Sequence, residues 1–163
     1  MIVIIEGLDG VGKTTLSEQI ADKYNFKYIK ESYTNNCEVK ECRMIDMLTR
    51  LTESKNYIYD RTTLIDDFVY SFLNETRSSL LNYFEIIIKI LSKCKIIHLE
   101  LNENIRKERF NKRGDQYVTN NDIKKIDKEY KNFYQNLNNV QYVSLTGNLE
   151  KDIEKVMEVI DYD

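Results

Sequence analysis

The sequence of 163 residues contains no proline, no tryptophan and only one histidine, His98. Its three cysteines make an odd number and follow no zinc-ligand spacing, so we expect reduced thiols rather than a disulfide framework or a Cys/His metal centre. A single histidine also leaves almost no basis for a Ser-His-Asp triad. The missing proline and the abundance of isoleucine, asparagine and lysine are typical of an A+T-rich genome, as in a phage or a bacterium of low G+C content.

Long apolar runs and a net positive charge are also missing. No run reaches the roughly 18 apolar residues of a membrane-spanning helix, and the densest apolar stretch, residues 86–91, includes Lys89. With a net charge of −3 and a pI near 5.4, no general basic field attracts nucleic acid or an anionic membrane. Residues 1–6 lack the basic region and the cleavage site of a signal peptide. We therefore expect a cytoplasmic protein whose partners are neither nucleic acid nor membrane.

Short apolar runs alternate with longer segments of helical period along the chain. The runs typical of strands are Ile2–Ile5, Phe26–Ile29, Tyr57–Tyr59, Lys95–Leu101 and Val140–Leu145. Residues 16–24, 123–137 and 149–160 have a helical period. No linker or repeat interrupts this pattern, so we predict one α/β domain over residues 1–163, with a doubly wound, five-stranded parallel sheet and helices on both faces. Ligands of such folds bind at the carboxyl ends of the strands.

Residues 7–14, between the first predicted strand and the first predicted helix, match G-x-x-x-x-G-K-[ST] without a mismatch. Glycines in such a loop let N–H groups point at phosphate oxygens, and the following helix N-terminus adds partial positive charge. Lys13 should reach the β- and γ-phosphates of ATP, and Thr14 should ligate Mg²⁺. The predicted ATP-binding residues are Gly7, Leu8, Asp9, Gly10, Val11, Gly12, Lys13, Thr14 and Thr15. The motif predicts a P-loop NTPase fold, and the short chain without a well-placed N-K-x-D favours a small phosphotransferase.

Four segments, the loop among them, carry a family resemblance. Residues 6–15 resemble the E-G-[LI]-[DE]-G-x-G-K-T-T loop of thymidylate kinases, and residues 60–62 resemble their D-R-Y/H segment and the E-R-S of deoxynucleoside kinases. Residues 108–114 resemble the lid sequence E-R-x-x-x-R-G, and residues 126–134 resemble the helix after the lid. The resemblance covers most of the chain. It implies a nucleoside or nucleotide kinase with a short arginine-bearing lid at about residues 106–118.

The resemblance implies roles at the phosphates. Asp60 would be an outer-sphere partner of the Mg²⁺ that Thr14 ligates, or a partner of Lys13. Arg61 would bind the acceptor's phosphate or the transferring group, because a guanidinium matches phosphate oxygens in a bidentate fork. A structural Asp-Arg pair is the alternative. Arg109 and Arg113, four residues apart, would close over the phosphates, and the alternative is a solvated basic face. The predicted catalytic residues are Lys13, Arg61, Arg109, Arg113 and Glu31.

The acceptor side leaves more alternatives open. Glu31 matches the general base of deoxynucleoside kinases or a residue that holds sugar and metal in thymidylate kinases, unless it is an ordinary solvated glutamate. Asp9 favours a monophosphate acceptor, whereas the run of Asp66, Phe68 and Tyr70 resembles the base pocket of deoxynucleoside kinases, or else belongs to the core or a dimer interface. Arg43 and Arg50 are further candidates for contact with the base or the acceptor's phosphate. The predicted substrate-binding residues are Asp9, Glu31, Arg43, Asp60, Arg61, Phe68 and Tyr70.

The predicted function is Mg²⁺-dependent transfer of the γ-phosphoryl group of ATP to a deoxynucleoside monophosphate, with dTMP as the expected acceptor. Two alternatives are a deoxynucleoside kinase that phosphorylates a 5′-hydroxyl and a nucleotide-binding protein without transferase activity. We expect adenine to lie between the lid and residues 146–148. The expected cofactors are ATP and Mg²⁺, and the apolar segment from Phe84 to Leu91 is a candidate homodimer interface or buried core.

Overall fold

The computed structural model describes residues 1–113 and 120–161. Its five strands form a single parallel sheet in the order β2-β3-β1-β4-β5. The strands are β1 (Ile2–Gly7), β2 (Lys27–Lys30), β3 (Tyr57–Asp60), β4 (Lys95–Leu101) and β5 (Val140–Leu145). Each coincides with a predicted run to within two residues at either end. The predicted doubly wound parallel sheet is therefore confirmed.

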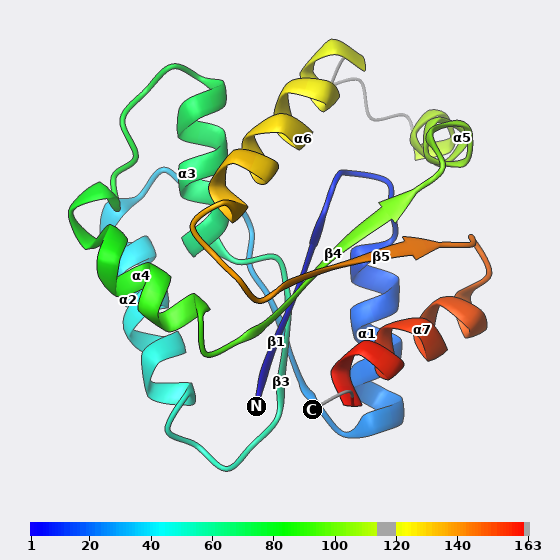
Figure 1. The fold of residues 1–163 in the computed structure, drawn as a ribbon, viewed down its shortest axis with the longest axis horizontal. Coiled ribbons are helices and arrows are strands. Elements are labelled where there is room, and N and C mark those ends of the chain that lie inside the picture. The colour runs from blue at the N-terminus through cyan, green and yellow to red at the C-terminus, as the bar shows by residue number, and fades with distance from the viewer. Residues whose placement is uncertain (114–119, 162–163) are drawn as a thin grey trace.

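Helices cover both faces of this sheet (Figure 1). Helices α1 and α7 lie on one face, and α2, α3, α4 and α6 lie on the other, while α5 extends beyond the carboxyl end of β4. Their bounds are α1 (Lys13–Tyr24), α2 (Cys37–Arg50), α3 (Thr63–Leu73), α4 (Phe84–Leu91), α5 (Glu103–Arg113), α6 (Asn120–Tyr134) and α7 (Leu149–Asp161), with a short 3₁₀ turn η1 (Leu81–Tyr83) before α4. Across residues 1–113 and 120–161, no helix is both long and apolar enough to cross a membrane.

The central strand β1 divides the hydrophobic core into two layers. Ile2 and Ile4 pack with α2, α3, α4 and α6, whereas Val3 and Ile5 pack with α1 and α7. Side chains alternate between the two faces of a strand, and both faces here are covered, so the whole β-branched run is buried. Because β1, β2 and β3 pair in parallel, their carboxyl ends lie at one edge of the sheet, where the phosphate-binding loop begins.

One sequence expectation about the helices changes, and one pair of alternatives is narrowed. The helical period of residues 123–137 places Leu137 on the apolar face of a helix, but α6 ends at Tyr134. Leu137 lies in the turn that follows, where its N–H donates to the Tyr134 carbonyl at 3.0 Å. Leu137 still packs against the core. In α4, Ile87 and Ile90 are buried, whereas Ile86 is 47% exposed. The segment therefore contributes mainly to the core, and its use as a dimer interface stays a prediction.

Candidate functional site

The loop between β1 and α1 has the backbone of a phosphate cradle. Gly7, Gly10 and Gly12 have φ values of 138°, 82° and 104°, a region that residues with a side chain rarely adopt. A Cβ atom on Gly7 would lie 2.6 Å from the Leu99 carbonyl oxygen on β4. Gly12 is the N-cap of α1, and no side chain caps the helix there. The first N–H groups of α1 are therefore available to an anion.

The Lys13 ammonium folds back into this loop. Its Nζ donates to the carbonyl oxygens of Gly7 at 2.6 Å and Leu8 at 2.9 Å, and only 6% of the residue is exposed. Burial, and then the positive charge of Arg61, lowers the pKa of Lys13 to about 8. An anionic ligand in the loop would offset both effects, because it would supply negative charge to a buried cation.

Asp60, at the end of β3, faces the start of α1. Its Oδ2 accepts a hydrogen bond from Thr14 Oγ1 at 2.5 Å and another from the Tyr28 hydroxyl at 3.2 Å. A hydroxyl and a carboxylate are oxygen ligands that suit Mg²⁺, which usually takes one or two such groups plus phosphate oxygens and water. No group of three or more Asp, Glu, His and Cys side chains that could hold a metal occurs in the described part of the chain. Thr14 and Asp60 therefore fit Mg²⁺ that arrives with a nucleotide.

Arg61 has a left-handed backbone, with φ of 71°, and its N–H donates to the Ile5 carbonyl at 3.0 Å. Its guanidinium forms an ion pair with Asp9 of the phosphate-binding loop and approaches the Tyr70 hydroxyl at 3.5 Å. Burial lowers the pKa of Arg61, but Asp9 and then Asp66 raise it above the ordinary value. The structure thus brings Asp9, Arg61 and Tyr70 together, although Tyr70 does not line the pocket described below, and their roles in substrate binding stay predictions.

Glu31 lies just beyond β2 and is only 8% exposed. Its Oε2 accepts the Thr63 N–H at the start of α3, at 2.7 Å. Arg43 donates to the Ser32 carbonyl at 2.7 Å and to Thr63 Oγ1 at 2.6 Å. Glu31 is therefore a fixed carboxylate rather than a solvated one. Arg43 thus holds the segment around Glu31 in place. It does not line the adjacent pocket, where the sequence predicts a substrate contact.

Residues of the phosphate-binding loop and of the ends of β2 and β3 line one pocket of about 310 Å³. It is lined by Asp9, Gly10, Gly12, Lys13, Thr14, Lys30, Glu31, Ser32, Tyr33, Asp60 and Arg61. Sequence reasoning missed Tyr33, which is 48% exposed and packs edge-to-face on Tyr70 with ring centroids 5.4 Å apart. Its position two residues after Glu31, past the end of a strand, was the available signal.

A second pocket, also about 310 Å³, lies on the other side of the loop, between α1, α5 and the β5–α7 connection. Arg109 Nη1 donates to the Val11 carbonyl at 3.0 Å, and Nη2 donates to the Gly147 carbonyl at 3.5 Å. This pocket occupies the region expected for adenine, and Arg109 reaches the phosphate-binding loop. Residues 114–119 of the predicted lid and the Arg113 side chain lie outside the described residues.

Besides Arg43, two further candidates lie away from the site. Phe68 is 1% exposed and packs in the core against Phe84 and Phe133, with ring centroids 5.4 and 5.3 Å apart. Residues two apart on a helix do not share a face, so Phe68 and Tyr70 cannot both line one pocket. Arg50 donates to the Tyr59 hydroxyl at 2.7 Å. The expected base contacts of Phe68 and Arg50 are thus replaced by packing and by a structural hydrogen bond.

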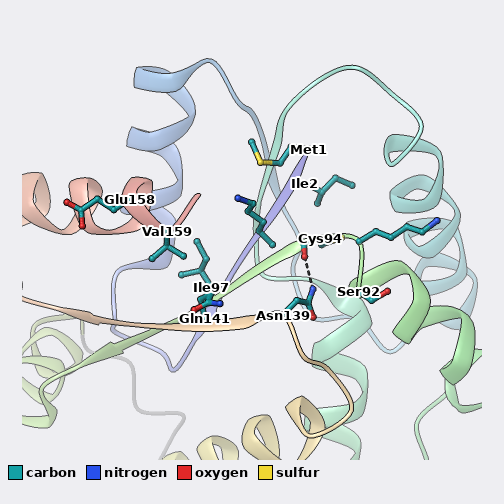
Figure 2. Close-up of a pocket in the computed structure, with 11 residues that line it drawn as sticks. Met1, Ile2, Ser92, Cys94, Ile97, Asn139, Gln141, Glu158 and Val159 are labelled. Carbon is teal, nitrogen blue, oxygen red and sulfur yellow. Dashed lines mark hydrogen bonds between the residues drawn. The ribbon is translucent and has the colours of Figure 1, made fainter. Parts of the chain in front are cut away.

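A larger cavity of about 810 Å³ lies at the amino ends of β1 and β4 (Figure 2). Figure 2 shows Asn139 beside it, hydrogen-bonded to the Cys94 carbonyl at 2.7 Å. No residue of the phosphate-binding loop lines this cavity. Ligands of parallel α/β folds bind at the opposite, carboxyl edge of the sheet. We therefore assign the candidate site to the two pockets of about 310 Å³ described above.

Comparisons with known proteins agree with this fold. No protein-family model matches the chain. The SPbeta prophage-derived uncharacterized protein YorR of Bacillus subtilis is 26% identical over 158 residues, which span 93% of this chain and 92% of that protein. The crystal structure of YorR in complex with phosphorylated GDP has a TM-score of 0.72 at 20% identity and covers 99% of this chain and 96% of that one.

Two kinases of assigned activity share the fold. Deoxyadenosine kinase from M. mycoides with bound dCTP has a TM-score of 0.67 at 23% identity, over 100% of both chains. Thymidylate kinase from Candida albicans has a TM-score of 0.60 at 14% identity, over 99% of this chain and 91% of that one. The resemblance to P-loop nucleoside and nucleotide kinases is confirmed at the level of the fold.

Proposed function

We propose that this protein is an ATP-dependent deoxynucleoside kinase in which the Glu31 carboxylate accepts the proton of the acceptor's 5′-hydroxyl. The observation that carries the proposal is the position of Glu31, buried and held by the Thr63 N–H in the same pocket as Lys13, Asp60 and Arg61. A hydroxyl acceptor must lose its proton during phosphoryl transfer, whereas a phosphate acceptor is already ionised at neutral pH. A fixed carboxylate at this point therefore suits a hydroxyl acceptor better than a monophosphate.

The charges that line the pocket support the same acceptor. Its lining includes the cations Lys13, Lys30 and Arg61 and the carboxylates Asp9, Glu31 and Asp60. These charges balance before any ligand enters. A monophosphate would bring further negative charge beside the triphosphate, and a buried charge without a partner is costly. A neutral nucleoside adds no such charge. The likeness to deoxyadenosine kinase over the full length of both chains also supports a nucleoside acceptor.

On the donor side, the loop N–H groups and Lys13 would bind the triphosphate once the ammonium leaves the carbonyl oxygens of Gly7 and Leu8. Arg109, already at the loop, would neutralise charge that develops on the transferring group, and Arg113 stays the predicted second lid arginine. Thr14 and Asp60 would hold Mg²⁺, which neutralises phosphate charge when it is bound. The protein thus contributes positioning and charge, with one proton accepted at Glu31.

The monophosphate kinase predicted from the sequence, with dTMP as acceptor, is the second candidate. Arg61 favours it, because a guanidinium that now pairs with Asp9 would match the oxygens of an acceptor phosphate equally well. In that reaction Asp9 would turn toward the sugar, and Glu31 would hold the acceptor without taking a proton.

Release of ADP from Mg·ATP, measured with a panel of deoxynucleosides, their monophosphates and dUMP, tests the proposal. We expect turnover with an unphosphorylated nucleoside. Glu31→Gln should then lower kcat by about 100-fold or more with ATP affinity unchanged, while the exposed control Glu38→Gln should retain wild-type kcat. Turnover with monophosphates alone would overturn the proposal in favour of the second candidate. ATP binding without turnover on any acceptor would favour a nucleotide-binding protein without transferase activity.

A further inference from the structure

Behind the phosphate-binding loop, one tyrosine hydroxyl lies between two buried carboxylates. Tyr130 on α6 donates to Asp66 Oδ1 on α3 at 2.8 Å, and its oxygen is 3.3 Å from Oε2 of Glu6 on β1. Glu6 is 0%, Tyr130 1% and Asp66 2% exposed. None of the three belongs to the pocket that we assign to the reacting groups. The cluster nevertheless joins α6 to β1, which leads into the phosphate-binding loop, and to α3, whose Thr63 N–H holds Glu31.

The number of protons in this cluster follows from its hydrogen bonds. A tyrosine hydroxyl has one proton to donate, so it can satisfy only one of two ionised carboxylates. The second carboxylate would place its charged oxygen against a lone pair of the Tyr130 oxygen in a buried site, which is strongly unfavourable. The cluster is satisfied when one carboxyl group is protonated and donates to the Tyr130 oxygen, while Tyr130 donates to the other, ionised group.

The geometry favours Glu6 as the protonated member. The shorter contact, 2.8 Å, is the one to Asp66, as expected for a hydrogen bond to an ionised acceptor. The Glu6 Oε1 atom accepts the Thr62 N–H at 2.8 Å, a bond that a neutral carboxyl group also makes. Burial, and then the charge of Asp66, raises the pKa of Glu6 well above its ordinary value. Burial also raises the pKa of Asp66 above its ordinary value, although the positive charge of Arg61 and the hydrogen bond from Tyr130 oppose that rise.

The other titratable groups around Glu6 are consistent with a single negative charge in the cluster. Arg61 and Lys13 carry positive charge toward both carboxyl groups and therefore stabilise the one remaining negative charge. His98, the neighbour of Glu6 in the sheet register, is buried, and burial lowers its pKa to about 4, so it is neutral. With Glu6 protonated, the Arg61 guanidinium faces one buried negative charge, that of Asp66, in addition to its ion pair with Asp9.

We propose that Glu6 is protonated at neutral pH and, with Tyr130 and Asp66, positions Arg61 for phosphoryl transfer. Glu6 anchors the N–H of the residue after Arg61, and the Ile5 carbonyl anchors the N–H of Arg61 itself. Together they hold Arg61 in the left-handed conformation that directs its side chain to the phosphate-binding loop. Glu6 is thus a positioning residue, and Asp66 supplies the charge. The kinetic consequence rests on the proposed function, whereas the position of the proton does not.

Glu6→Gln tests the assignment directly, because a glutamine has the shape and the hydrogen-bonding pattern of a protonated glutamate. Its amide N–H can donate to Tyr130, and its oxygen can accept from Thr62. We expect Glu6→Gln to keep kcat within about twofold of wild type, and Glu6→Ala to lower kcat by about 100-fold with little change in the KM for ATP, because it frees the Arg61 segment. Asp66→Asn removes the ionised member and should lower kcat, unlike Glu6→Gln. A Glu6→Gln protein as impaired as Glu6→Ala would overturn the proposal.

Infrared spectroscopy at pH 7 locates the proton without any turnover. We expect the carbonyl stretch of a protonated carboxylic acid in the wild-type protein and its loss in Glu6→Gln. The exposed control Glu154→Gln should retain the band. A wild-type spectrum without the band, or a band that Glu6→Gln leaves in place, would overturn the proposal even if Glu6→Ala fails to fold. If the infrared result holds and no acceptor on the panel is phosphorylated, the proton is correctly assigned and the proposed function is wrong.

Discussion

Acidification should destabilise this protein through its one histidine. His98 is 2% exposed, its Nδ1 lies 3.0 Å from the Tyr134 hydroxyl, and the rings of Tyr130, Tyr134 and Tyr142 surround it at 5.3 to 5.5 Å. Burial lowers the pKa of His98 to about 4. The folded protein therefore keeps His98 neutral at pH values where an exposed histidine is already charged.

The sign and size of the effect follow from linkage. Above pH 6.5 His98 is neutral in both states and contributes no pH dependence. As the pH falls through 6.5 the unfolded chain takes up a proton that the folded protein does not bind until about pH 4, so the free energy of unfolding decreases. The pKa difference of about 2.5 units corresponds to a loss of about 3 kcal/mol between these pH values. At and above neutral pH this loss is absent.

Urea denaturation of wild type and His98→Phe at several pH values from 7 to 4 measures the effect. The wild type should lose about 3 kcal/mol more than the variant over this range, because the variant lacks only this titration and the carboxyl groups act in both. The NMR signal of the single imidazole supplies a direct titration. Parallel pH profiles of the two proteins, or an imidazole that titrates near its ordinary pKa in the folded state, would refute the reasoning.

Three further perturbations test the fold and the donor site. Gly7→Ala should weaken ATP binding by at least about tenfold in calorimetry, because its Cβ would lie 2.6 Å from a backbone oxygen at a φ of 138°; unchanged affinity would contradict the cradle. Phe68→Ala should cost about 3–5 kcal/mol of unfolding free energy, whereas the 58% exposed Phe72→Ala should change it by less than about 0.5 kcal/mol; equal losses would show that Phe68 is not core. Arg109→Gln should lower kcat by about 100-fold, and wild-type turnover would remove Arg109 from the site.

The sequence alone determined the strands, the sheet and the phosphate-binding loop of this protein. Each of these depends on local pattern. The continuous β-branched run at Ile2–Ile5 is typical of a strand that is buried on both faces, and the glycines of residues 7–14 allow a loop that other residues would block. The placement of Asp60 and Glu31 near that loop also followed from sequence, because the carboxyl ends of parallel strands meet at one edge of the sheet.

Only the tertiary structure decided which side chains share a space. Phe68 and Tyr70 have the same sequence neighbourhood, but the direction of α3 in the fold sends one to the core and the other toward Arg61. The hydrogen bond between Tyr130 and Glu6 joins residues 124 positions apart. Periodicity marks a residue as inward-facing and carries no information about its partner on another element, because that partner depends on how whole helices pack against the sheet.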